Sequence, residues 1–205
     1  MPMNNKPENK MKAALPLILS AVLAVPFLTG CAAAVIGGTA ATVAAIHDRR
    51  TTGTIIEDQN IKLRVRNLLS EHPEIDSRSN ISVTSYNQRV LLYGQTEDAA
   101  LADAFAEKVS KLPKVNAVYN EVLEGARSDA WDYSRDTALV TKIKALLVNV
   151  DVEDFDPTRV KVAAADGNIY LMGLVTPEEG AAVVEYVRGI SGVKRVVEIF
   201  EYVNT

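Results

Sequence analysis

The sequence contains few of the residues that metal centres and nucleophilic active sites use. Its 205 residues include one cysteine, Cys31, and two histidines, His47 and His72. A single cysteine excludes an intrachain disulfide and a cysteine-based zinc site. Basic residues number 22 and acidic residues 26, a net charge of -4, which argues against a broad nucleic-acid-binding surface. We therefore expect no catalytic triad, no metal and no nucleic acid partner.

The apolar run near the amino terminus is too short to cross a membrane. Residues 13–27 are largely apolar and follow Lys6, Lys10 and Lys12. About fifteen such residues fall short of the ~20 that a membrane span needs. A basic start before a short apolar run indicates a secretory signal. The next four residues, Leu-Thr-Gly-Cys at 28–31, resemble the lipobox of bacterial lipoproteins.

The lipobox resemblance implies that residues 1–30 are a lipoprotein signal peptide, removed by cleavage before Cys31. It also implies a diacylglycerol on the Cys31 sulfur and an acyl chain on the new amine; we expect no other cofactor. Alanine rather than aspartate at position 32 implies sorting to the outer membrane. The mature chain would carry 19 basic and 25 acidic residues. Several acyl chains, at ~0.8 kcal/mol per buried CH₂, give stable anchoring.

The segment after the lipobox has no persistent helical or strand period. Glycines at 37, 38 and 53 interrupt it. We predict that residues 31–57 are the acylated cysteine and a flexible tether. A coil of this length spans ~28 Å, which would keep the folded part close to the membrane.

The rest of the chain contains an internal repeat of about seventy residues. Residues 61–69 align with 139–147, and in both segments apolar residues recur at helical spacing. Each copy continues with a β-rich hairpin pattern, an alanine-rich helical stretch and a closing β-rich run. The second hairpin has an Asp166-Gly167 turn, a strong hairpin signal.

We therefore predict an α+β fold of two tandem domains, each ordered helix–strand–strand–helix–strand. In each domain a three-stranded mixed sheet would pack on two helices. Gly94 and Gly173 close the second strand of their copies and suit a bulge or a positive φ. The predicted boundaries are 58–125 for the first domain, 126–135 for a linker and 136–205 for the second domain.

This layout resembles the BON domain. The matching pieces are the hairpins that end at Gly94 and Gly173, residues 118–121 (Val-Tyr-Asn-Glu), 172–176 (Met-Gly-Leu-Val-Thr) and 191–196 (Ser-Gly-Val-Lys-Arg-Val). A lipobox, a tether and two such copies resemble the dual BON-domain lipoproteins of the Gram-negative outer membrane. The resemblance implies a periplasm-facing protein that supports envelope integrity. It further implies that the second domain binds anionic phospholipid, and that the protein is found at division sites and near the outer-membrane protein assembly machinery.

The sequence offers little support for an enzyme. His47 falls in the predicted tether and His72 in a loop, and both are expected to be ordinary surface histidines. Paired carboxylates fall in loops and helix starts, where solubility and helix-terminus electrostatics explain them. Residues 151–156 lack the glycine and the terminal glutamate of an EF-hand calcium loop. We predict a non-enzymatic protein.

The first helix of the second copy is more apolar than its counterpart. Val140 stands where the first copy has Lys62, and Val148 stands where it has Ser70. Apolar residues outside a core stripe indicate a contact surface. With the preceding aromatic residues and nearby lysines they predict an interfacial lipid-binding patch. The patch comprises Trp131, Tyr133, Val140, Lys142, Lys144, Leu147 and Val148.

Two alternatives remain open, one for the contacts of the patch and one for the function of the protein. Val140 and Val148 could instead pack against the first copy, with Trp131 between the domains. From Asp136 onward there are eleven acidic and seven basic residues, so that only a local patch could attract an anionic membrane. The alternative function is a protein–protein adaptor for envelope machinery, such as outer-membrane protein assembly or the regulation of cell-wall hydrolases.

Overall fold

A computed structural model describes residues 48–126 and 130–204, apart from the side chains of Ala130 and Trp131. The signal peptide, Cys31 and residues 32–47 of the predicted tether lie outside the described residues. None of the helices within these ranges combines the length and the apolar composition that a membrane crossing requires.

The first domain follows the predicted order of elements, with one short helix added. Its first helix begins after Thr51, whose side chain accepts a hydrogen bond from the Thr54 amide, and Asp98 caps the later helix in the same way. The elements are α4 (Thr52–Ser70), α5 (Pro73–Asp76), β1 (Ser79–Tyr86), β2 (Arg89–Thr96), α6 (Ala99–Ser110) and β3 (Ala117–Glu124).

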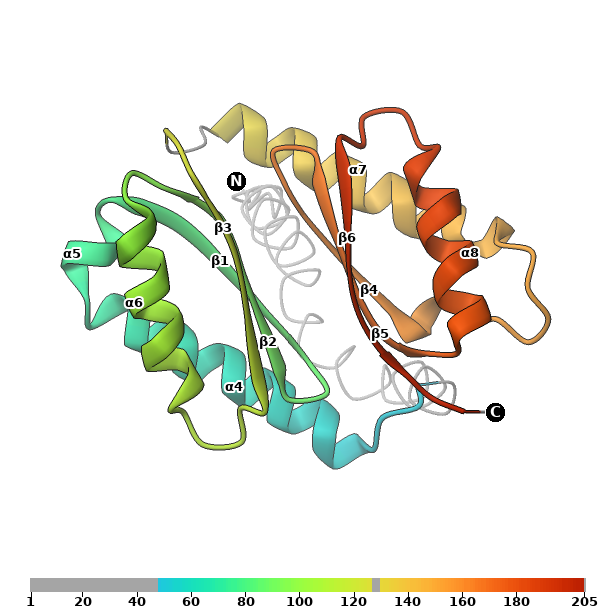
Figure 1. Cartoon of the computed structure of the whole chain (residues 1–205), viewed down its shortest axis with the longest axis horizontal. Coiled ribbons are helices and arrows are strands. Elements are labelled where there is room, and N and C mark those ends of the chain that lie inside the picture. Colours follow the sequence, from blue (N-terminus) through green and yellow to red (C-terminus); the bar gives the residue numbers. More distant parts are fainter. Residues whose placement is uncertain (1–47, 127–129, 205) are drawn as a thin grey trace, which may run out of the picture. The chain divides into compact units, whose positions relative to one another are not determined.

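The second domain repeats this order (Figure 1). Its last helix begins with a capping box in which Thr176 and Glu179 each bond the other's backbone amide. The elements are α7 (Ala130–Leu146), the 3₁₀ turns η2 (Leu147–Asn149) and η3 (Pro157–Arg159), β4 (Val160–Ala165), β5 (Asn168–Val175), α8 (Pro177–Arg188) and β6 (Arg195–Tyr202).

Each domain contains the predicted three-stranded mixed sheet. The strand orders are β1-β2-β3 and β4-β5-β6, with an antiparallel first pair and a parallel second pair. Both hairpins turn through two residues of positive φ, Asn87-Gln88 and Asp166-Gly167. This backbone matches the right-handed twist of paired strands. The α+β prediction is confirmed.

Two helices begin before the predicted domain limits. Helix α4 begins at Thr52, inside the predicted tether, since the Thr51 cap outweighs the helix-weakening effect of Gly53. Helix α7 begins at Ala130, inside the predicted linker. The folded part therefore contains more of the chain than the sequence pattern indicated.

Gly94 and Gly173, each two residues before the end of its strand, serve different backbone needs. Gly94 has φ of 121°, and a Cβ there would lie 2.1 Å from the Asn80 carbonyl oxygen. Gly173 does not have a positive φ, but a Cβ there would lie 2.6 Å from the Arg159 carbonyl oxygen. The prediction of a special backbone conformation thus holds for Gly94, whereas Gly173 is required by a close backbone approach.

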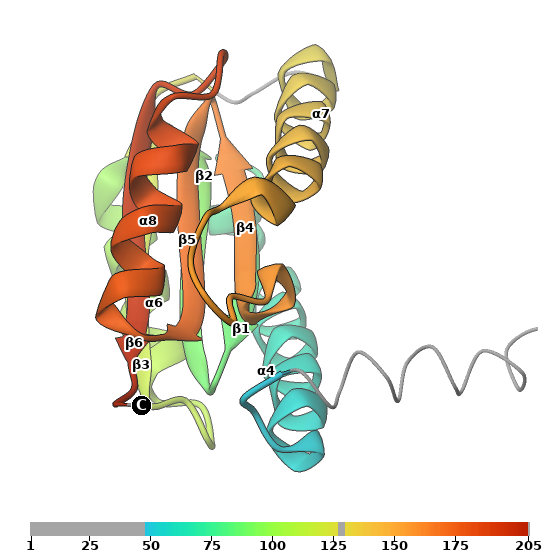
Figure 2. The same cartoon turned by 90° about the vertical axis from the view of Figure 1, so that its right-hand side faces the viewer.

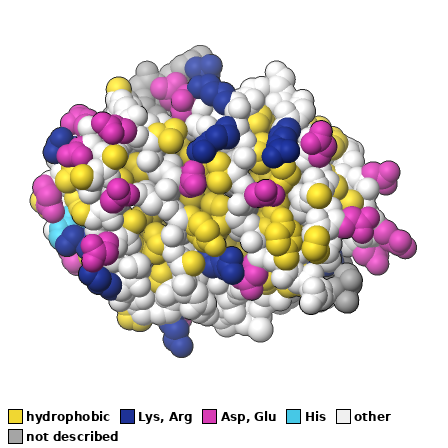
Figure 3. Space-filling model, in the orientation of Figure 1, with side chains coloured by type: hydrophobic (Ala, Val, Ile, Leu, Met, Phe, Trp, Pro, Cys, Tyr) yellow, Lys and Arg dark blue, Asp and Glu magenta, His cyan; other side chains and the backbone are white. Residues whose placement is uncertain are grey.

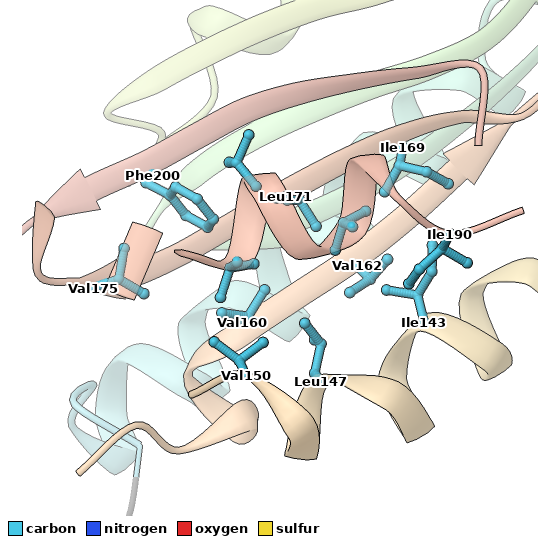
Figure 4. Close-up of a cluster of buried hydrophobic side chains, with 13 residues drawn as sticks. Ile143, Leu147, Val150, Val160, Val162, Ile169, Leu171, Val175, Ile190 and Phe200 are labelled. Carbon is cyan, nitrogen blue, oxygen red and sulfur yellow. The ribbon is translucent and has the colours of Figure 1, made fainter. Parts of the chain in front are cut away.

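Each domain has its own core between the sheet and its helices. In the first domain this core contains Ile61, Val65, Val90, Leu92 and Phe105, all essentially inaccessible to solvent. In the second domain Ile143 and Leu147 point from α7 and η2 toward the sheet (Figure 4).

A third apolar cluster joins the outer faces of the two sheets. Its buried members include Tyr86 and Leu91 from the first domain and Tyr170, Met172 and Leu174 from the second. Alternate residues of β5 therefore face opposite ways, and all eight of its residues are buried. The domains dock through their sheets, while Figure 2 places α4 and α7 on one side of the stacked sheets.

Candidate functional site

Four of the predicted lipid-binding residues belong to one side of α7 and the turn that follows it. Tyr133, Val140 and Lys144 recur at spacings of seven and four, which places them on one stripe of the helix. Tyr133 is 69% exposed and Val148, in η2, is 67% exposed. Val140 is half-buried against the core of its own domain. These residues form the part of the predicted patch that the structure brings together.

Two of the predicted residues do not belong to that stripe. The prediction for Leu147 is wrong: its side chain is 1% exposed and lies in the core, because the chain tightens into a 3₁₀ turn there. Lys142 lies on the other flank of the buried stripe, where its Nζ donates a hydrogen bond to the Ser191 carbonyl (3.1 Å). Trp131 belongs to α7, but its side chain lies outside the described residues, as does Cys31.

The alternative in which Val140 and Val148 form the domain interface is not what the structure shows. Val148 is exposed, and Val140 packs on its own domain. The interface instead uses the sheet faces and polar contacts around them. Tyr86 Oη donates to the Arg159 carbonyl (3.1 Å), and Arg195 pairs with Glu121 (3.0 Å).

The segment before α4 binds both domains. Arg49 pairs with Glu179 of the second domain (2.6 Å), and Arg50 pairs with Asp58 of the first (2.8 Å) and lies 3.7 Å from the centre of the Tyr86 ring. Burial opposes ionisation of Glu179, but hydrogen bonds from Arg49, Thr176 and Arg159 outweigh it and keep its pKa below the usual value. No sequence motif pointed to this contact.

A groove runs between α4 and α7, along the edges of β1 and β4. We call it the α4–α7 groove. It consists of two adjoining hollows of about 330 and 250 Å³ that share Ser82, Tyr93 and Tyr133. Arg66 lines the smaller hollow and Lys144 the larger one. The same stripe of α7 that carries Tyr133 and Val140 therefore forms one wall of the groove.

The surroundings of the groove are positively charged although the protein is acidic. Burial lowers the pKa of Lys161, on β4, to about 8; repulsion from Lys62, Arg50 and Lys144 adds to this effect, and attraction to Asp58 opposes it. Lys161 Nζ donates to the carbonyl of Ser85 on β1 (3.1 Å). By contrast, acidic and basic side chains are interspersed on the face seen in Figure 3. Arg66 and Lys144 line the groove together with one acidic residue, Asp136, so the groove favours an anionic group.

His72 is the one histidine among the described residues, and no cysteine lies among them. His72 Nδ1 lies 2.9 Å from a carboxylate oxygen of Glu74, on the surface. Within residues 48–126 and 130–204, no three His, Cys, Asp or Glu side chains are gathered as a metal site would require. His47 lies outside the described residues.

Comparisons with known proteins identify the repeated unit. The family model described as "BON domain" matches residues 57–124 and 135–204. Outer membrane lipoprotein DolP of Haemophilus influenzae is 35% identical over 93% of this chain and 96% of its own length. The 21 kDa hemolysin of Actinobacillus pleuropneumoniae is 31% identical over 77% of this chain and 80% of its own. The solved structure of CdsD, a structural protein of the type III secretion system of Chlamydia trachomatis, covers 73% of this chain and 92% of its own, with 13% identity and a TM-score of only 0.28.

Proposed function

This chain belongs to the BON-domain family and is an outer-membrane lipoprotein with two copies of that domain, and from this premise we propose that its second domain binds anionic phospholipid. The binding surface is the exposed part of the stripe on α7 and η2, namely Tyr133, Lys144 and Val148. The role is non-enzymatic: the protein holds a folded body at the membrane and supports outer-membrane integrity.

The observation that carries this proposal is the exposure of Tyr133 and Val148 at the two ends of one stripe, with Lys144 between them. Tyr133 and Val148 are fifteen positions apart, which corresponds to about 22 Å of helix, so that the stripe fits a helix lying along a surface. Tyrosine rings favour the membrane interface, and lysine favours lipid phosphate.

The charge of the second domain limits how this binding can work. Its eleven acidic and seven basic residues from Asp136 onward would be repelled by an anionic surface as a whole. Attraction must therefore be local to the stripe. Acyl chains on Cys31 would raise the concentration of the domain at the lipid surface and allow a weak contact to suffice.

The test is co-sedimentation of a soluble chain starting at Ala45 with vesicles of phosphatidylcholine, with or without phosphatidylglycerol. This start retains Arg49 and Arg50, which bind both domains. We expect binding only to the anionic vesicles, and weakening by salt. Val148→Glu should reduce binding at least tenfold. The matched control is Ile56→Glu, at a 57% exposed apolar position of the first domain. Equal binding to neutral vesicles, or equal loss in both variants, would overturn the proposal.

The finer parts of the role rest on the resemblance to dual BON-domain lipoproteins. We include in the proposal the acylation of Cys31, a periplasm-facing position and enrichment at division sites near the outer-membrane protein assembly machinery. Mass spectrometry of the mature chain tests the acylation, and a fluorescent fusion tests the placement.

The second candidate function is a protein–protein adaptor for envelope machinery, including the regulation of cell-wall hydrolases. The open edge of β1 in the α4–α7 groove favours it.

A further inference from the structure

Strand β1 lies at the edge of its sheet, and its hydrogen-bonding direction alternates along the chain. The amide of Glu97 donates to the carbonyl of Arg78 (3.0 Å), which fixes the residues of even number as those that face β2. The odd-numbered residues therefore direct their backbone groups away from the sheet. The hydrogen bond from Lys161 Nζ to the Ser85 carbonyl agrees with this alternation.

The outward backbone groups of Ile81 and Val83 have no hydrogen-bond partner among the residues that the structure describes. Both residues line the α4–α7 groove. On the other side of the groove the two-residue turn of the second hairpin sets the same alternation in β4, and Val162 and Ala164 carry the outward groups there. The groove is thus bordered by two strand edges that present amides and carbonyls in turn.

The cationic side chains that line the groove can also form ion pairs with a bound ligand. Arg66 and Lys144 are exposed, and neither has an ion-pair partner within the described part of the chain. One acidic residue, Asp136, lines the groove, but its carboxylate accepts hydrogen bonds from the amides of Asp166 and Gly167. An occupant that supplies carboxylates would pair with Arg66 and Lys144.

These features discriminate between possible occupants. A phosphate headgroup offers only acceptors and would leave the carbonyls of Ile81 and Val83 unpaired. A second copy of this chain, paired edge to edge, would bring the same cations close to one another. An extended peptide offers both donors and acceptors at the spacing of a strand, and can carry acidic side chains.

We propose that the α4–α7 groove binds an extended acidic segment of a partner protein, which adds to the free edge of β1 as a fourth strand. The segment pairs with the backbone of Ile81 and Val83. Its acidic side chains reach Arg66 and Lys144, and its intervening side chains lie against the rings of Tyr93 and Tyr133. The first and second domains both contribute to the site, which shares Tyr133 and Lys144 with the proposed lipid-binding surface but does not include the exposed Val148.

The test uses the mature chain in detergent micelles and a ten-residue probe peptide in which glutamate and valine alternate. Three further peptides serve as comparisons: one with lysine in place of glutamate, one with alternate backbone nitrogens methylated on the pairing edge, and one with the other edge methylated. Binding is measured by fluorescence polarisation and by the NMR shifts of the Ile81 and Val83 amides. Inorganic phosphate is the competitor.

We expect the glutamate peptide to bind and to shift both amides. Arg66→Glu combined with Lys144→Glu should weaken binding at least tenfold. The control pair, Lys108→Glu with Arg188→Glu, makes the same charge change at exposed positions on other helices and should leave it unchanged. Methylation of the pairing edge should abolish binding, and methylation of the other edge should not.

Absence of binding, equal loss in both pairs of variants, or equal binding of the two methylated peptides would overturn the proposal. Complete displacement by inorganic phosphate would show that the groove recognises a phosphate group instead. The variant Val148→Glu should still bind the peptide, so that failure of the lipid proposal and failure of this one give different results.

Discussion

The guanidinium of Arg49 lies 2.6 Å from the carboxylate of Glu179, a buried residue 130 positions later in the chain. Arg159 approaches the same carboxylate from the second domain (2.7 Å), and Arg49 also donates to the Leu174 carbonyl (3.0 Å). The residues that precede the first domain are therefore part of the second domain's structure. A fragment that starts at residue 58, where the sequence pattern placed the domain boundary, would lose this contact.

Removal of the Glu179 charge should destabilise the folded protein strongly. Glu179→Gln leaves two arginines at the buried site without their carboxylate, which typically costs about 3 kcal/mol. Arg78→Ala removes contacts of an exposed arginine and should change stability by less than ~1 kcal/mol. Urea denaturation of the two variants measures both values. Similar losses in the two would contradict a special role for Glu179.

Lys161 should make stability depend on pH in the alkaline range. Its pKa is lowered to about 8 in the folded protein from an ordinary 10.5, so that the unfolded chain binds more protons between these values. Folding stability from this group therefore rises as pH increases from about 8 to 10.5. Thermal unfolding of the wild type and of Lys161→Met at several pH values isolates the effect. The stability of the wild type should rise relative to that of the variant across this pH range. A constant difference would mean that the Lys161 pKa is not lowered.

Truncation of two neighbouring apolar residues should change the free energy of unfolding by very different amounts. Leu147 is 1% exposed and packs in the second core, and Leu147→Ala should cost about 3 kcal/mol of unfolding free energy. Val148 is 67% exposed, and Val148→Ala should change stability by less than ~0.5 kcal/mol. Chemical denaturation distinguishes them. A large loss for Val148→Ala would mean that this side chain is covered.

Substitution of Gly94 should be far more harmful than substitution of Gly125. A Cβ at Gly94 would lie 2.1 Å from a backbone oxygen of β1, and φ is 121°, so that Gly94→Ala should cost about 2 kcal/mol or more. At Gly125 no atom lies within 4 Å of the added Cβ. The melting temperatures of the two alanine variants provide the comparison. A neutral Gly94→Ala would require the β1–β2 pairing to differ from the one described.

Local patterns in the sequence were sufficient to predict the repeated fold. Helical spacing identified α4 and α7, and the Asp166-Gly167 turn identified the second hairpin. The start of α4 was missed because one capping threonine extends the helix past a glycine. The burial of Leu147 was missed because a 3₁₀ turn changes the period that places side chains on a helix.

The surfaces between distant parts of the chain were less accessible to sequence reasoning. The apolar run of β5 was a usable signal, since a strand that is apolar on both faces is buried on both faces. Tyr170 and Met172 could have been assigned to a domain interface on that ground. Nothing local links Arg49 to Glu179, because each residue alone is typical of a solvated surface.

The burial of both faces of β5 also constrains the order in which the protein assembles. During synthesis and export the first domain leaves before the second, and until the second arrives Leu91 and the apolar part of Tyr86 lack their partners. The partly exported protein therefore exposes an apolar surface that is buried once the second domain has docked. Docking of the second domain covers this surface, and a chain cut between the two domains would expose an apolar sheet face on each half.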